Sequence, residues 1–437
     1  MKLRLFPLAG LALLLAACSS DEPEVIDDPI IEQPSDEQPS EEPTVVVPKT
    51  RTDISLTAEG SKANDAANQF ALDFFLALYQ HQDKGANLLV SPFSAQAALA
   101  MTANGAKGET LNEMLSVMGM QGLSLDDINQ YNQAIVKALT EIDNTSVVES
   151  ANGIWVKKPL CLLDSYTRQI ELFYDTTPKS IAFSPDDIAS INEWVKARTQ
   201  GMIPSLYDED ERPNCEMLLA NALCFKAVWK NPFIADWTQK GTFTNADGSK
   251  TTVDMMFKQN YNMNVAASRK TFDLCAKPYG NGAFSMVLML PHEGNTLEEC
   301  IGELARQDWK QLNDEIEKSH SAIALYMPKF ELPVAKYDLK TTLIDMGMIL
   351  PFTLWADFSG MTQDAALMID KCEQKCTLSV DEKGSQAAAV TKVEMVLTAD
   401  STPQPALHDF ILNRPFAFLI KEKSTGAILF AGAVNKL

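Results

Sequence analysis

Few residues of this 437-residue chain have the types and spacings that perform catalysis. The histidines are His81, His292, His320 and His408. None has the His-Glu-x-x-His spacing that presents two imidazoles to zinc on one helix face. A Gly-x-Ser-x-Gly nucleophile turn and a glycine-rich phosphate loop are also absent from the sequence. A triad or carboxylate pair assembled from distant positions stays open, but the sequence favours a protein that is no enzyme and needs neither metal nor cofactor.

The eight cysteines favour burial over disulfide or metal chemistry. Setting aside Cys18, which is discussed below, leaves seven, so at least one thiol is unpaired. Cys372 and Cys376 are the only close pair, and no histidine or second cysteine pair stands near them at zinc spacing. Cys224 lies in an apolar run, as a small buried side chain would.

The residue pattern with the clearest chemical consequence lies near the C-terminus. From Ser385 onward, every second residue is small or apolar: Ser385, Ala387, Ala389, Thr391, Val393, Met395 and Leu397. The residues between them, which form the other parity, are mostly polar or tolerant of water. This is the period of a strand with one buried face. The segment nevertheless lies among about 35 residues between the predicted strands that end at Val380 and begin near Phe416, a spacing typical of a loop.

A segment that can be both loop and strand is a bistable element. Its small residues come first, so its leading end could enter between two strands without forcing their side chains apart. Inserting residues 385–397 would form backbone hydrogen bonds on both sides, which at about 0.5–1.5 kcal/mol each amounts to roughly ten kcal/mol or more. At about 3.3 Å per residue, insertion would move the far end of the loop by roughly 40 Å.

Helical patterns precede strand patterns along the chain. Apolar residues recur at helical spacing from Ala67 to Leu78. Ser91-Pro92 and Ser184-Pro185 each pair an N-cap with a proline at the first helical position, and the helices they begin should end near Gly105 and Gly201. Short apolar runs then predict strands at 218–225, 286–290, 323–327, 416–420 and 428–434. Segregated helices and strands favour an α+β fold.

The segment Val380–Thr391 resembles the proximal hinge of the serpins, a family that inserts its reactive loop into a β-sheet. Framework segments of the family are matched in the same order, at Asn87–Ser94, Gly105–Thr110, Ile191–Val195, Asn221–Trp229, Met327–Phe330 and Asn413–Phe416. The resemblance covers roughly Ser55 to Leu437. It implies the serpin fold, with three β-sheets, eight to nine helices and an exposed reactive-centre loop.

The resemblance also implies a function. A serpin of the inhibitory type is a suicide inhibitor: a target protease cleaves the exposed loop, is held as the acyl-enzyme, and is carried across the molecule as the loop enters the central sheet. We expect a monomer whose partners are serine proteases, with papain-like cysteine proteases as a second class. Two alternatives stay open, a non-inhibitory serpin fold used for binding or adhesion and a tethered solute- or glycan-binding lipoprotein.

Residues at two places take roles from the resemblance. The hinge that begins insertion is matched at Glu382, Gly384, Ser385, Ala387, Ala388, Ala389 and Thr391. Of these, Ser385 and the three alanines are small enough to permit insertion, and Val390 replaces the usual small residue on the exposed parity, where it should cost little. Ser91, Ser94 and Asn221 match the shutter of the sheet, and Trp229 matches the tryptophan where insertion begins. Gln374 stands where the family usually has a shutter histidine, and its amide can donate and accept hydrogen bonds but cannot titrate.

Family spacing from Glu382 places the scissile bond at Thr398-Ala399, preceded by the subsite residues Val396 and Leu397. Small and mid-sized aliphatic groups suit elastase-like serine proteases, and Leu397 also suits papain-like enzymes. A shift of one residue would put Leu397 at the bond and favour chymotrypsin-like enzymes.

The N-terminus resembles a bacterial lipoprotein signal. Lys2 and Arg4 precede the apolar run Leu5–Ala17, which is too short to span a bilayer and ends in small residues before Cys18. Residues 1–17 would then be the signal peptide, and Cys18 would carry the lipid. An ordinary secretory signal with an incidental cysteine is the alternative.

Residues 18–55 are interpreted as an acidic, proline-rich tether, and residues 56–437 as the serpin domain. Between Ser19 and Thr50 lie ten acidic residues, one basic residue and six prolines, a composition that favours an extended chain over an acidic edge of the domain. Asp21 and Glu22 resemble an export signal, so we expect the lipid to hold the protein on the outer membrane, facing outward. The net charge of −21 argues against nucleic acid as a ligand.

Overall fold

A computed structural model describes residues 47–208, 211, 215–265, 268–319, 321–363, 366–385 and 408–437. All of them belong to one compact unit, Pro43–Leu437. Within these described residues, no helix is both long and apolar enough to cross a membrane.

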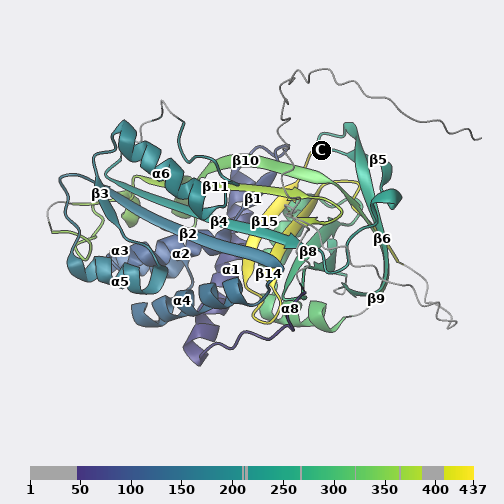
Figure 1. Cartoon of the computed structure of the whole chain (residues 1–437), viewed down its shortest axis with the longest axis horizontal. Helices are drawn as coiled ribbons and strands as arrows, with labels where there is room; N and C mark the ends of the chain where they lie inside the picture. The colour runs from purple at the N-terminus through teal and green to yellow at the C-terminus, as the bar shows by residue number, and fades with distance from the viewer. Residues whose placement is uncertain are drawn as a thin grey trace, which may run out of the picture. The chain divides into compact units, whose positions relative to one another are not determined.

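Nine α-helices and two short 3-10 helices lie in the described residues (Figure 1). The α-helices are α1 (Ala58–His81), α2 (Pro92–Ala103), α3 (Gly108–Val117), α4 (Leu125–Glu141), α5 (Asp164–Tyr174), α6 (Pro185–Arg198), α7 (Leu297–Ala305), α8 (Trp309–Lys318) and α9 (Lys340–Asp345). The 3-10 helices are η1 (Ala235–Trp237) and η2 (Leu350–Phe352). The number of α-helices agrees with the eight to nine that the family resemblance implied.

The helix starts predicted from serine-proline pairs are confirmed. Ser91 caps α2 by accepting a hydrogen bond from the backbone amide of Ser94, and Ser184 caps α6 through a reciprocal capping box with Asp187. Both helices end two or three residues before the predicted glycines, α2 at Ala103 and α6 at Arg198.

The strands are most frequent in the second half of the chain. They are β1 (Leu88–Val90), β2 (Ser146–Lys157), β3 (Lys179–Ile181), β4 (Met217–Val228), β5 (Gln239–Thr244), β6 (Lys250–Val265), β7 (Phe272–Pro278), β8 (Phe284–Pro291), β9 (Ser321–Pro328), β10 (Phe330–Asp338), β11 (Lys371–Val380), β12 (Gly384–Ser385), β13 (His408–Ile411), β14 (Phe416–Glu422) and β15 (Ile428–Val434). All five predicted strands lie within β4, β8, β9, β14 and β15.

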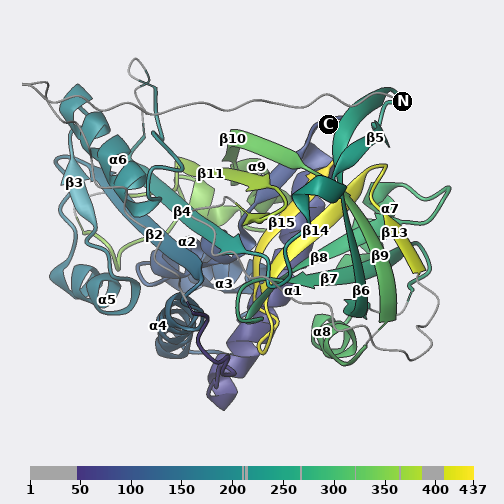
Figure 2. The same cartoon turned by 45° about the vertical axis from the view of Figure 1, so that its right-hand side comes forward.

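The strands form three sheets, two of which share β6, so the described fold is the expected α+β arrangement. The central sheet has the order β10-β11-β12-β4-β2-β3. A second sheet runs β1-β15-β14-β8-β7-β6, and the other part of β6 pairs with β5 and β9, beside which β13 is added. Figure 1 shows the central sheet with α1 and α2 behind it, and Figure 2 shows β5, β6, β9 and β13 as a separate layer.

The predicted bounds of the connection after β11 are confirmed, since β11 ends at Val380 and β14 begins at Phe416. Two short strands, β12 and β13, lie within this connection, and β13 was not predicted. The four residues of β13, His408–Ile411, carry mixed polar and apolar side chains and therefore show no strand pattern. Their strand geometry comes from parallel pairing with β9.

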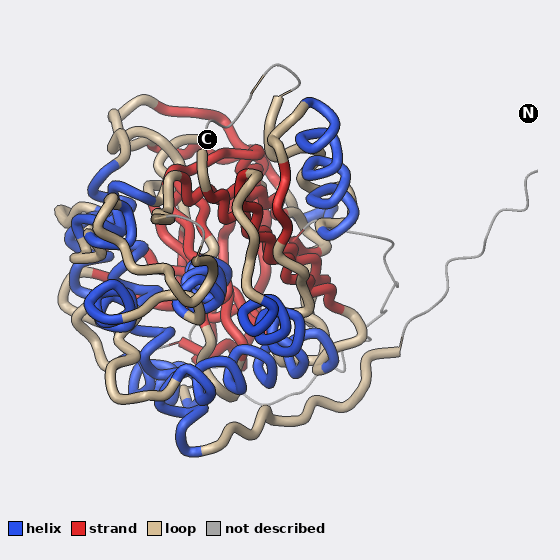
Figure 3. Tube along the Cα trace, turned by 90° about the vertical axis from the view of Figure 1, so that its left-hand side faces the viewer, coloured by secondary structure: helices blue, strands red, loops and turns tan. Residues whose placement is uncertain are grey.

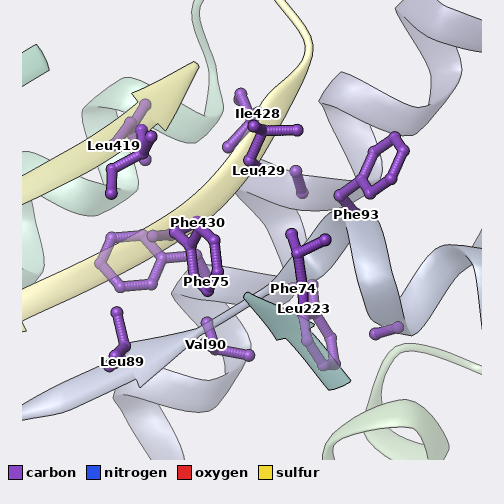
Figure 4. Close-up of a cluster of buried hydrophobic side chains, with 14 of the residues drawn as sticks. Phe74, Phe75, Leu89, Val90, Phe93, Leu223, Leu419, Ile428, Leu429 and Phe430 are labelled. Atoms are coloured by element: carbon purple, nitrogen blue, oxygen red, sulfur yellow. The ribbon is translucent and has the colours of Figure 1, made fainter. Parts of the chain in front are cut away.

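The hydrophobic core lies where the helices cover the sheets. Figure 3 shows most helices gathered around one side of the strands, and Figure 4 shows side chains from α1, α2, β1, β4, β14 and β15 meeting in one cluster. Phe74 and Phe75 of α1 and Leu429 of β15 are fully buried there. This packing joins the second sheet and, through Leu223 of β4, the central sheet to the helices. Leu218 and Ala220 of β4 belong instead to a second cluster, with Ile188 and Ile191 of α6.

The end of the proposed tether is bonded to the folded unit. The backbone amide of Lys49 donates to Asn144 Oδ1 (2.8 Å), and the Asn144 amide donates to the carbonyl of Val47 (2.9 Å). The amide of Ile54 donates to Ser424 Oγ (3.0 Å). The described part of residues 18–55 therefore lies along the domain.

Candidate functional site

The central sheet contains an opening between its two middle strands, β4 and β11. At one end, which we call the base, Lys371–Gln374 of β11 pair in parallel with Leu218–Asn221 of β4. At the other end, which we call the hinge end, β12 lies between the strands: Ser385 pairs with Val380 of β11 and with Ala227 of β4. Between the two ends, no pairing joins β4 to β11 in the described residues. Between β12 and the base, β4 and β11 therefore each present a strand edge that is not paired with the other.

A tight turn brings the chain from β11 into this opening. The carboxylate of Asp381 accepts hydrogen bonds from the backbone amides of Lys383 (2.7 Å) and Gly384 (3.1 Å), and its own amide donates to the carbonyl of Gly384 (3.0 Å). A Cβ atom at Gly384 would lie 2.0 Å from the carbonyl oxygen of Ala227 on β4. Because backbone atoms cannot yield at that distance, the approach of β12 to β4 requires glycine.

Trp229, at the end of β4, holds the turn in place. Its indole Nε1 donates to the carbonyl of Asp381 (2.9 Å), and its backbone amide donates to the carbonyl of Lys383 (2.7 Å). The Trp229 ring stacks on Tyr279 with centroids 4.1 Å apart and an interplanar angle of 12°. The Tyr279 hydroxyl in turn lies 2.6 Å from Ser385 Oγ, so the same aromatic pair contacts both ends of the turn.

A buried lysine lies against the rings of Trp229 and Phe233. Lys277 is 3 % exposed, and its ammonium lies 4.9 Å from the Trp229 ring centre and 4.2 Å from that of Phe233. It donates to the carbonyl of Asn231 (2.9 Å). Burial lowers the pKa of Lys277 to about 7, and the charge of Lys258 adds to the effect.

Glu382 fixes the outer edge of the turn. Its carboxylate lies 2.7 Å from Lys329 Nζ and accepts a hydrogen bond from Thr238 Oγ1 (2.8 Å). Burial opposes ionisation of Glu382, but these two partners outweigh it and hold its pKa below the ordinary value. Its backbone carbonyl accepts from the amide of Phe233 (2.9 Å).

At the base, a pair of hydrogen bonds from one side chain ties the central sheet to the start of α2. Gln374 Oε1 accepts from the backbone amide of Ser91 (2.8 Å), and Gln374 Nε2 donates to the carbonyl of Ser91 (2.9 Å). Ser91 Oγ donates to the carbonyl of Leu429 on β15 (2.7 Å). Both residues are completely buried, so the start of α2, the central sheet and the second sheet are tied together at this point.

The other two residues that match the shutter are Ser94 on α2 and Asn221 on β4. Ser94 is fully buried on α2, and its hydroxyl has no hydrogen-bond partner within the described residues. Asn221 lies opposite Gln374 in the register of β4 and β11, but its side chain lies outside the description. Cys376, two residues from Gln374, is buried, and this burial raises the pKa of its thiol to about 12.

The structure thus brings together Glu382, Gly384, Ser385 and Trp229 at the hinge end, and Ser91, Ser94 and Gln374 at the base. The other predicted hinge and loop residues lie outside the described residues: Ala387, Ala388, Ala389, Thr391, Val396, Leu397, Thr398 and Ala399, together with Cys18. Tyr279 and Lys277 were not predicted. The Gly280-Asn281-Gly282 turn beside Tyr279 was the only local signal for them, and it carries no information about a contact with β12.

A sequence model of the serpins, described as serine protease inhibitors, matches residues 65–437. The chain belongs to the serpin family. Its relatives include Iripin-5 from the tick Ixodes ricinus, which is 31% identical over 377 residues, covering 85% of this chain and 94% of the relative. Intracellular coagulation inhibitor 2 from Tachypleus tridentatus is also 31% identical, covering 85% of this chain and 90% of the relative.

Solved serpin structures agree with this assignment. The thermophilic serpin tengpin in its native state superposes with a TM-score of 0.78 at 29% identity, covering 89% of this chain and 97% of tengpin. Human thyroxine-binding globulin with its bound hormone superposes with a TM-score of 0.76 at 27% identity, covering 87% of this chain and 99% of the globulin. The serpin fold therefore extends over nearly all of the described residues.

Proposed function

We propose that this serpin is a suicide-type inhibitor of serine proteases and that it traps the acyl-enzyme by inserting its cleaved loop between β4 and β11. The observation that carries the proposal is the opening itself. It has a strand edge on each side, the first two loop residues already paired at its hinge end, and a base closed by parallel pairing. Insertion would extend β12 through the opening toward the base.

The residues after Ser385 suit this path. Ser385 is fully buried in β12, and the following positions of the same parity, Ala387 and Ala389, are small. Each residue that enters pairs with both neighbouring strands, at about 0.5–1.5 kcal/mol per hydrogen bond. This gain drives insertion only after cleavage frees the far end of the loop.

The proposed targets are elastase-like serine proteases, cleaving at Thr398-Ala399 after Val396 and Leu397. Cleavage one residue earlier would instead favour chymotrypsin-like enzymes, and Leu397 suits papain-like cysteine proteases. We further propose that Cys18 carries a lipid that holds the protein on the outer membrane, facing outward. The acidic, proline-rich sequence that follows supports this role because it suits a tether.

A binding role is the second candidate, because thyroxine-binding globulin, with the same fold, was solved with a bound hormone. In that case a cut loop would remain outside the sheet. The hinge sequence argues against it, since no bulky or charged side chain occupies the positions that must enter the opening first.

The test is to mix the full chain with pancreatic elastase at a near-equimolar ratio and run a reducing, denaturing gel. Trapping predicts a band at the summed mass that survives boiling, and sequencing of the released C-terminal peptide would locate the cleaved bond. Clipping without this band by elastase, chymotrypsin and papain alike would overturn the inhibitory function.

A matched pair of variants tests whether insertion depends on the parity of the loop. Ala387→Arg places a long charged side chain on the buried parity, and Gln386→Arg places the same side chain on the other parity. We expect Ala387→Arg to be clipped as an ordinary substrate and Gln386→Arg to retain the stable complex. Equal loss in both variants would contradict the proposed register.

A further inference from the structure

A cavity of about 320 Å³ lies next to the hinge contacts, among β7, β8, the end of β14, α8 and the segment before α1. Its wall contains three cationic side chains, Arg51, Lys230 and Lys423, and one carboxylate, Glu317. The whole chain has a net charge of −21. The wall of the cavity therefore carries positive charge on a protein whose net charge is negative, and such a surface attracts anions.

Glu317 does not neutralise the cavity. Its Oε1 atom lies 2.6 Å from Nζ of the fully buried Lys421, and its Oε2 atom lies 2.7 Å from Lys423 Nζ. The buried carboxylate of Glu422 also acts on Lys421, so these two ammonium groups and two carboxylates balance. The excess positive charge of the wall comes from Arg51 and Lys230.

Arg51 and Lys230 supply positive charge on the other sides. Arg51 is 2.7 Å from Asp53, but the Asp53 side chain is 67 % exposed, so water weakens this pair. Lys230 forms no ion pair among the residues that the structure describes. Its backbone amide donates to the carbonyl of Pro278 (3.0 Å), and a Cβ atom at Gly282 would lie 3.3 Å from its ammonium. The ammonium of Lys230 therefore rests against the turn between β7 and β8.

A buried hydroxyl in the wall is left without a partner. Ser285 of β8 lines the cavity, is 5 % exposed, and its Oγ has no hydrogen-bond partner within the described residues. Buried hydroxyls are nearly always bonded, because an unpaired one loses its hydration without compensation. A ligand oxygen in the cavity would accept a hydrogen bond from it.

The carboxylate of Asp143, near the turn between β7 and β8, already accepts hydrogen bonds from neighbouring residues. Asp143 accepts hydrogen bonds from the backbone amide of Asn281 (3.3 Å), from Thr145 Oγ1 (2.7 Å) and from Ser146 Oγ (2.7 Å). It is 2 % exposed and does not line the cavity.

We propose that this cavity binds the oxyanion of a small phosphate or sulfate ester. Lys230 and Arg51 would form charge-assisted hydrogen bonds to the oxyanion, and Ser285 would donate to one of its oxygens. The cavity is larger than a bare phosphate or sulfate ion, so it leaves space for a small organic body beside Ala276 and Pro278. This proposal does not rest on the protease-trapping function.

The test is calorimetric titration of the full chain with inorganic phosphate, sulfate and acetate at constant ionic strength set with chloride. The variants are Lys230→Gln and Ser285→Ala. The control is Lys318→Gln, which removes an exposed ammonium of α8 that pairs with Asp314 (3.0 Å) and does not line the cavity. Circular dichroism of each variant checks that it is folded.

We expect saturable binding of one phosphate or sulfate per chain, tighter than that of acetate. Lys230→Gln should weaken it by about tenfold or more and Ser285→Ala by about threefold, while Lys318→Gln should leave it unchanged. Absence of saturable binding, or an equal loss in Lys230→Gln and Lys318→Gln, would overturn the site. Acetate binding as tightly as phosphate would overturn the assignment to phosphate and sulfate esters.

Discussion

The hinge end and the base of the opening both join β4 to β11, but they do so in opposite ways. At the hinge end the two strands are separated by a piece of the loop, and the contacts are made by the turn, Trp229 and Tyr279. At the base the strands pair directly, and the contact that secures them comes from Gln374 and the start of α2. If the loop inserts as we propose, one end is already occupied by the first residues of the entering strand, whereas the other must separate before that strand can pass.

This difference assigns separate energetic roles to the two ends. Changes at the hinge end should alter how fast the cleaved loop enters, because they act on the residues that enter first. Changes at the base should alter the stability of the uncleaved protein, because they act on buried hydrogen bonds that hold the sheet closed. Each prediction below asks whether the two ends can be perturbed separately.

The largest effect is expected from Gly384→Val at the hinge end. The new Cβ would meet the carbonyl oxygen of Ala227 at 2.0 Å, so β12 would have to leave its place against β4. Overpacking of this kind costs about 1–3 kcal/mol, and the fraction of elastase trapped should fall by about ten- to hundredfold. Gel analysis of complex against clipped chain measures this ratio. Trapping that equals that of the wild type would show that β12 is not the start of insertion.

At the base, Gln374→Leu should lower the thermal stability of the uncleaved protein. The change leaves the buried amide of Ser91 without a partner, at about 1–3 kcal/mol, and leaves the Ser91 carbonyl with only the amide of Ala95 (3.1 Å) as a donor. Scanning calorimetry would show a lower unfolding temperature, and the control is Thr377→Val, which removes one half-buried hydrogen bond on the same strand. A loss no greater than that of Thr377→Val would contradict the role of Gln374.

The sequence predicted the fold and the base better than the hinge end. Ser91 carries a local signal, a serine before a proline, and Gly384 and Ser385 belong to a recognisable alternating segment. Lys277 and Tyr279 carry none, because their partners at Trp229 and Ser385 are distant in sequence. A lysine in a strand normally faces water, so its burial against two aromatic rings is set by tertiary packing alone.

A smaller effect, specific to the hinge end, should appear in the pH dependence of Lys277→Met. Below about pH 7 the Lys277 amine is protonated in both the folded and the unfolded chain. As the pH rises from about 7 toward the ordinary lysine pKa near 10.5, the unfolded chain binds more protons. Wild-type stability should therefore rise relative to that of Lys277→Met, by at most about 1.4 kcal/mol per pH unit. Parallel curves of unfolding temperature against pH for the two proteins would contradict the lowered pKa.

The smallest effect is expected from Glu382→Gln. The amide retains an acceptor for Thr238 and loses only the charge facing Lys329, whose side chain is 39 % exposed. Such a partly solvated pair contributes about 0.2–1 kcal/mol. Because the pKa of Glu382 lies below its ordinary value, this contribution is present near neutral pH and is lost as the pH falls through the folded-state pKa. Denaturant unfolding from pH 7 downward should give a difference between the two proteins that is largest near neutral pH and shrinks as the pH falls below the ordinary glutamate pKa.

The central claim is that the opening between β4 and β11 receives the cleaved loop, and the most direct measurement is the unfolding temperature of the full chain before and after elastase cuts it. Insertion worth roughly ten kcal/mol should raise this temperature by about 12 °C. The Ala387→Arg protein, cut in the same way, should gain little. An unfolding temperature that does not rise when the wild-type loop is cut would contradict the account.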